Sequence, residues 1–137
     1  MRPPHTPLSS FTTTMSQTLS ALIGTYACAD ILTNLSNPLV YIWAYQVLPG
    51  KVDDFYELYG PKGSWVALFR RAPGYLDTQL LLDRIQAGRF LTIDRWESKV
   101  AFTSFRDKFA EEFDRLDRLG EQLTSHEVLL GEFGNAG

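Results

Sequence analysis

The pattern of apolar and polar residues changes sharply near Asn37-Pro38. Before this point serine and threonine are frequent, and the apolar residues follow neither the period of a strand nor that of a helix. After it, segments with strand and helix patterns follow one another closely. We therefore expect residues 1–38 to be a poorly ordered N-terminal extension and residues 39–134 to form one folded domain.

Four segments of the domain have the composition of β-strands. Residues 40–48 are rich in β-branched and aromatic side chains, and Pro49-Gly50 follows them as a turn. Residues 75–82 and 89–96 predict two more strands, which a loop at residues 83–88 connects. Residues 127–133 predict the last strand.

Two regions show the spacing of amphipathic helices. Residues 53–72 have this spacing, but Gly60-Pro61 interrupts it because Pro61 has no N–H to donate, so we expect two helical pieces or one kinked helix. The second region follows Ser98, a favourable N-cap, and predicts one helix with a single apolar stripe. The stripe consists of Phe102, Phe105, Phe109, Phe113, Leu116 and Leu119.

The order β, α, β, β, α, β predicts an α+β domain of the ferredoxin-like type, with a four-stranded antiparallel sheet and helices on one face. Both sheet faces are apolar: in the first strand Val40, Ile42 and Ala44 alternate with Tyr41, Trp43 and Tyr45. Two helices cover only one face, and monomers rarely expose so large an apolar patch. We expect a homodimer packed sheet against sheet, with cover by the N-terminal extension as the alternative.

Charge and cysteine content exclude several classes of function. The chain has 13 Lys and Arg against 16 Asp and Glu, so we expect no nucleic-acid partner. Cys28 is the only cysteine, which excludes an intrachain disulfide and a thiolate zinc site. No apolar run is long enough to span a membrane. Residues 19–29 end in a pattern similar to a signal-peptidase site, but polar residues dilute the apolar run, and we expect a cytoplasmic protein.

Short motifs between residues 42 and 133 match those of a known family. They include Ile42-Trp43, Pro49-Gly50, Tyr59-Gly60-Pro61, Gly74-Tyr75-Leu76 and Asp94-x-Trp96-Glu97-Ser98. In these motifs the chain resembles the antibiotic biosynthesis monooxygenase (ABM) family of dimeric α+β barrels. The resemblance implies that dioxygen oxygenates a small aromatic substrate, such as a quinol or polyketide phenol, without metal or flavin. The sequence contains no phosphate loop, metal-ligand cluster or dinucleotide fingerprint, so we expect no cofactor.

The resemblance also suggests site residues. Trp96 matches the family's pocket tryptophan, and Asp94 and Thr92 share its strand face. We predict Trp96, Asp94 and His126 as catalytic residues; His126 is chosen because histidine titrates near neutral pH. Trp96 as a core residue and His126 as an exposed residue at a strand start are the alternatives. The predicted substrate-binding residues are Trp43, Tyr45, Tyr59, Trp65, Tyr75, Thr92, Phe102 and Phe105.

Other functions of the same fold remain open. Cofactor-free family members are expected to carry a tyrosine where this chain has Phe102, so another phenol would have to replace it. The family's haem enzymes carry a histidine on the second helix, but residues 106–108 are Arg, Asp and Lys, and we expect no haem. A non-catalytic ligand-binding module, or an isomerase or cyclase acting on similar substrates, is the alternative function.

Overall fold

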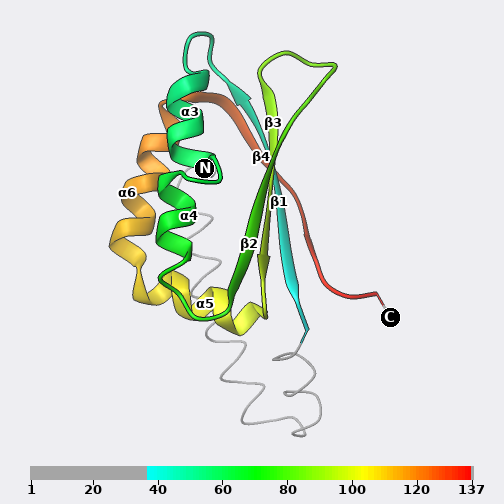
Figure 1. Ribbon diagram of the computed structural model, residues 1–137, viewed down its shortest axis with the longest axis vertical. Helices are drawn as coiled ribbons and strands as arrows, with labels where there is room; N and C mark the ends of the chain where they lie inside the picture. Colours follow the sequence, from blue (N-terminus) through cyan, green and yellow to red (C-terminus); the bar gives the residue numbers. More distant parts are fainter. Residues whose placement is uncertain (1–36, 137) are drawn as a thin grey trace, which may run out of the picture.

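The fold consists of one antiparallel sheet packed against one layer of helices (Figure 1). The computed structural model describes residues 37–136, so the expectation for residues 1–36 lies outside the described residues. The elements are β1 (Leu39–Val47), α3 (Val52–Tyr59), α4 (Ser64–Phe69), β2 (Tyr75–Leu82), β3 (Arg89–Trp96), α5 (Lys99–Lys108), α6 (Ala110–Glu121) and β4 (Thr124–Phe133). This order confirms the predicted ferredoxin-like α+β fold.

The sheet has the strand order β2-β3-β1-β4, and each neighbouring pair is antiparallel. β1 and β3 are central, and Tyr41 lies opposite Asp94 while Trp43 lies opposite Thr92. β4 begins at Thr124, three residues before the predicted start. β2 and β4 form the two edges of the sheet.

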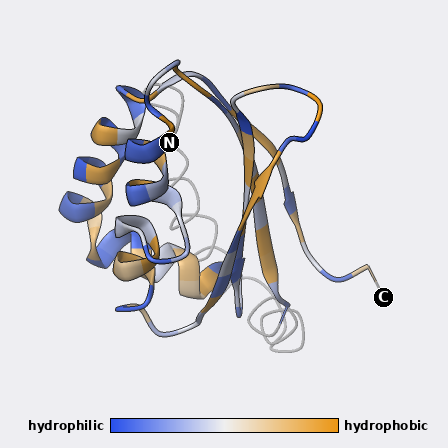
Figure 2. Cartoon of the chain, turned by 45° about the horizontal axis from the view of Figure 1, so that its top comes forward, coloured by the Kyte–Doolittle hydropathy of each residue, from blue (hydrophilic) through white to orange (hydrophobic). Residues whose placement is uncertain are grey.

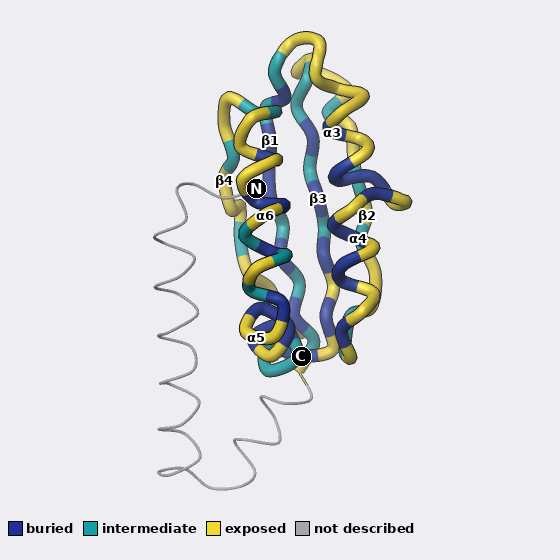
Figure 3. The backbone as a smooth tube through the Cα atoms, turned by 90° about the vertical axis from the view of Figure 1, so that its left-hand side faces the viewer, coloured by how far each residue is buried: buried dark blue, intermediate teal, exposed yellow. Residues whose placement is uncertain are grey.

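Helices cover one face of the sheet (Figure 1), and the buried residues concentrate on the central strands β1 and β3 and on the helices (Figure 3). This inner face carries Tyr41, Trp43 and Tyr45 from β1 and Phe90 and Trp96 from β3, all of them buried. No helix of the described residues lies on the opposite side of the sheet, the outer face (Figure 2). The apolar residues of the outer face are Val40, Ile42, Ala44, Leu81, Leu91, Ile93, Val128, Leu130 and Phe133.

The two helical regions differ in how well the sequence predicts them. The first divides at Gly60-Pro61 into α3 and α4, as expected. The second is not one helix: α5 ends at Lys108, and α6 begins at Ala110. Phe109 bends the chain with φ −109° and ψ 31°, yet it still donates to Phe105 O at 2.9 Å and accepts from Phe113 N at 2.9 Å. The apolar spacing does not reveal this bend because these hydrogen bonds keep the phenylalanine stripe on one side.

Candidate functional site

Three side chains on the inner face, ending at Asp94, are linked by hydrogen bonds. Asp94 lies on β3 and is 4% exposed. Thr78, opposite Asp94 on β2, donates from Oγ1 to Asp94 Oδ1 at 2.8 Å. The hydroxyl of Tyr75 donates to Thr78 Oγ1, also at 2.8 Å. A buried carboxylate is therefore joined to a half-buried phenol through one hydroxyl group.

Trp96 lies two residues beyond Asp94 on the same strand face and has no exposed surface. Aromatic rings surround it, with centroids at 5.0 Å for Phe105, 5.4 Å for Phe102 and Tyr75, and 5.5 Å for Phe69. Its Nε1 makes no hydrogen bond within the described part of the chain. A buried donor of this kind costs about 1–3 kcal/mol, which an oxygen of a bound ligand would recover.

A second polar cluster lies on the inner face near the start of β4. Thr92 Oγ1 donates to the Tyr45 hydroxyl at 3.3 Å, and the rings of Tyr45 and Tyr59 are 4.8 Å apart. Burial raises the pKa of Tyr59 well above its usual value, and the nearby Tyr45, Glu127 and Asp117 raise it further. Tyr59 therefore stays protonated at neutral pH.

His126 lies on the outer face, across the sheet from Asp94 and Trp96. Its neighbour in the sheet is Gln46, and its Nδ1 is 3.1 Å from Ser125 Oγ. Side chains alternate along β4, so the next residue, Glu127, lies on the inner face opposite Tyr45. The structure thus brings together two of the three predicted catalytic residues and separates His126 from them.

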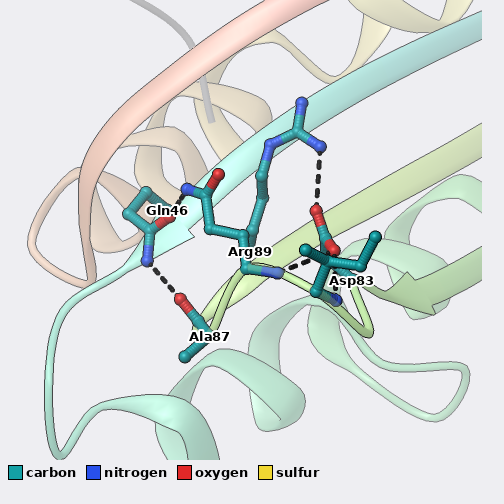
Figure 4. A network of polar contacts seen from close by, with 6 residues as sticks. Gln46, Asp83, Ala87 and Arg89 are labelled. Carbon is teal, nitrogen blue, oxygen red and sulfur yellow. Dashed lines mark hydrogen bonds and ion pairs between the residues drawn. The ribbon is translucent and has the colours of Figure 1, made fainter.

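His126 borders a groove of about 580 Å³ at one end of the outer face. The loop between β2 and β3 forms one side of this groove and is held in place by side chains (Figure 4). Gln46 Nε2 donates to Ala87 O at 2.9 Å, and Arg89 Nη1 is 3.2 Å from Asp83 Oδ2. Hydrogen bonds from backbone N–H groups lower the pKa of Asp83, and the bond from Gln86 N has the largest effect. Arg89 lowers this pKa as well.

All eight predicted substrate-binding residues belong to the buried layer or pack against it, in contrast to His126. They are Trp43, Tyr45, Tyr59, Trp65, Tyr75, Thr92, Phe102 and Phe105. The residues predicted from the sequence do not include Thr78, Glu127 and Asp117. Asp117 was detectable, since it follows Phe113 by four residues and so lies on the apolar stripe of α6, where it is fully buried.

Two structural features are absent from residues 37–136. No three His, Cys, Asp or Glu side chains of this segment lie close enough together to bind one metal ion. None of its helices has both the length and the apolar character required to cross a membrane.

Solved structures with this fold come from several organisms. PA3566 from Pseudomonas aeruginosa is 25% identical, with a TM-score of 0.58 over 75% of this chain and 98% of that protein. A variant of SnoaB, a cofactor-independent oxygenase from Streptomyces nogalater, is 17% identical, with a TM-score of 0.60 over 73% and 94%. A conserved protein from Methanosarcina mazei Go1 is 12% identical, with a TM-score of 0.57 over 74% and 96%.

Sequence comparison identifies the family directly. None of the curated proteins matches the chain. Residues 38–110, more than half of the chain, match the family described as antibiotic biosynthesis monooxygenase. This segment includes β1, β2, β3 and α5, and with them Asp94, Thr78 and Trp96. The chain therefore belongs to the antibiotic biosynthesis monooxygenase family.

Proposed function

We propose that this protein is a monooxygenase that oxygenates a small aromatic substrate, a quinol or polyketide phenol, without a bound cofactor. The observation that carries the proposal is the buried Asp94 carboxylate, which lies in an aromatic layer two residues from Trp96 and accepts a hydrogen bond from Thr78. Family membership supports the reaction class, and SnoaB, with the same fold, is a cofactor-independent oxygenase. Cytoplasmic location stays a prediction.

The reaction begins with removal of a proton from the substrate. Asp94 accepts this proton, and Trp96 Nε1 donates a hydrogen bond to the oxygen that becomes negatively charged. The electron-rich anion then reduces dioxygen. For an anthrone-like substrate, one oxygen atom becomes a ring carbonyl, and the other leaves as water. The oxidised carbon loses two hydrogens and this water gains two, and a proton from solvent replaces the one that Asp94 accepted. The substrate supplies all the electrons, so this balance requires no further reductant.

Substrate entry requires side chains to move. Trp96 has no exposed surface, and Phe102 and Phe105 of α5 lie against its ring. We therefore propose that α5 moves away from the sheet when the substrate binds. The same packing favours a second candidate function, a ligand-binding module of this fold that performs no reaction, because in the structure described here these side chains fill the space around Trp96.

Oxygen uptake by chelator-treated protein tests the proposed reaction, with a panel of dihydroxy aromatic and anthrone-like substrates. Asp94→Asn should lower kcat by about 100-fold or more, the usual contribution of a general base. Trp96→Phe should lower it as well, because the ring remains but the N–H donor is lost. The matched control is Asp77→Asn, which removes an exposed carboxylate of β2 that pairs with Arg95 at 3.7 Å.

The outcomes separate the candidates. Loss of activity in Asp94→Asn and Trp96→Phe, with activity retained in Asp77→Asn, supports the proposed site. Full activity in both site variants would keep the reaction class and assign it to other residues. Tight binding of aromatic ligands without oxygen uptake by the wild-type protein would favour the ligand-binding module.

A further inference from the structure

The hydrogen bonds at Asp94 form a path from the interior towards the surface. Asp94 is buried, whereas Thr78 and Tyr75 are each half-buried. The hydroxyl of Tyr75 donates to Thr78 Oγ1, and Thr78 Oγ1 donates to Asp94 Oδ1, both at 2.8 Å. Both distances are typical of strong hydrogen bonds between oxygen atoms.

A β-bulge makes this path possible. Residues three apart in a regular strand point to opposite faces of a sheet, so Tyr75 and Thr78 would normally be separated. The pairing of β2 with β3 shifts between Tyr75, which lies opposite Trp96, and Asp77, which lies opposite Arg95. This shift places Tyr75 on the inner face with Thr78. Bulges that redirect one side chain are frequent next to active sites.

We propose that Thr78 and Tyr75 relay the proton that Asp94 accepts from the substrate out to solvent. This inference rests on the proposed function, in which Asp94 is the proton acceptor. Before transfer, the Thr78 hydroxyl turns towards Tyr75, and the Tyr75 hydroxyl turns towards water. Asp94 then gives its proton to Thr78, Thr78 gives its own to Tyr75, and Tyr75 releases one to water. Each hydroxyl gains and loses one proton, no electrons move, and the hydroxyl orientations of the structure are restored.

The groups around Tyr75 keep its hydroxyl protonated, as a proton relay requires. Burial raises the pKa of Tyr75, and the charges of Asp94 on β3 and Asp77 on β2 raise it too. The hydrogen bond with Thr78 and the charge of Arg70 after α4 lower it. The net effect is a raised pKa, so Tyr75 stays protonated at neutral pH and can both donate and accept. Phe69 and Trp96 pack against its ring and fix its position.

Substitutions at Thr78 test the proton relay without changing Asp94, the proposed proton acceptor. Thr78→Val removes the hydroxyl but keeps the shape of the side chain, whereas Thr78→Ser keeps the hydroxyl. In oxygen-uptake assays across the neutral pH range, Thr78→Val should lower kcat about 10- to 100-fold at unchanged KM, and Thr78→Ser should stay within about threefold of wild type. Imidazole, as a small external proton acceptor, should raise the rate of Thr78→Val more than that of wild type.

A titration that does not depend on activity accompanies these assays. NMR of isotope-labelled tyrosine should show that Asp94→Asn lowers the pKa of Tyr75 more than Asp77→Asn does, because Asp94 contributes more to the rise. An unchanged pKa of Tyr75 in Asp94→Asn would overturn the proposed coupling.

The kinetic outcomes distinguish the two proposals. A wild-type kcat and pH profile in Thr78→Val, together with an inactive Asp94→Asn, would overturn the relay and leave the proposed function intact. A wild-type protein that oxygenates no substrate would overturn the proposed function, and the relay with it. A loss in Thr78→Val that Thr78→Ser restores supports both.

Discussion

At the scale of single residues, the titration of Tyr59 gives a test of the buried polar cluster. Its pKa is raised well above 10.0 in the folded protein, chiefly by burial. The unfolded chain loses this proton near pH 10 and the folded protein keeps it, so stability is complete below that pH and falls as the pH rises further. The slope from this residue is at most about 1.4 kcal/mol per pH unit.

Tyr59→Phe should therefore flatten the alkaline decline in the free energy of unfolding, measured by urea denaturation at a series of pH values above neutral. Tyr56→Phe is the control, because Tyr56 lies on the same helix and is 44% exposed. Equal slopes in wild type and Tyr59→Phe would contradict the assignment. The absolute stability of Tyr59→Phe is not the readout, since loss of a buried hydroxyl changes it at every pH.

The sequence predicts the strand face of some candidate residues and not of others. The family motif and the two-residue strand period place Asp94 and Trp96 on one face, and the structure places both on the inner face. For His126 and Glu127, adjacent in sequence, orientation depends on where β4 begins and how it pairs with β1. The sequence contains no marker for that register, nor for the bulge that turns Tyr75 towards Thr78.

At the scale of elements, the turn between α4 and β2 determines how closely α5 approaches the sheet. Gly74 has a φ of +91°, and a Cβ added there would lie 2.5 Å from Ala101 Cβ on α5. Its carbonyl also accepts from Glu97 N at 2.7 Å, just before α5 begins. The Pro73-Gly74 pair predicts a helix stop from sequence, but the contact with α5 follows only from the tertiary packing.

Gly74→Ala should therefore lower the free energy of unfolding by about 2–4 kcal/mol, because the strain of a positive φ adds to overpacking against α5. Gly50→Ala is the matched control, with a φ of +80° and no atom within 4 Å of the added Cβ. It should cost only the strain, about 1 kcal/mol. Chemical denaturation of both variants measures the difference, and equal losses would show that α5 adjusts freely to the extra methyl group.

At the scale of the whole molecule, the main feature is the apolar outer face of the sheet. Val128, Leu130 and Phe133 of β4 are 51%, 47% and 48% exposed on this face. Ile42 and Ile93 lie on the two central strands, β1 and β3. The alternation of apolar residues in β1 predicts this second apolar face from sequence alone. Soluble monomers rarely expose a patch of this kind, so we propose that two copies pack through their outer faces.

Sedimentation at micromolar concentration should then give twice the chain mass of 15.5 kDa. Val128→Asp should shift the protein to monomers, because it would bury an unpaired charge in the interface, and it should weaken the dimer by about 100-fold or more. Leu119→Asp is the matched control, since Leu119 is 44% exposed but lies on α6, away from the outer face. A wild-type protein with the mass of one chain would contradict the dimer and make the N-terminal extension the next segment to test as the cover of this face.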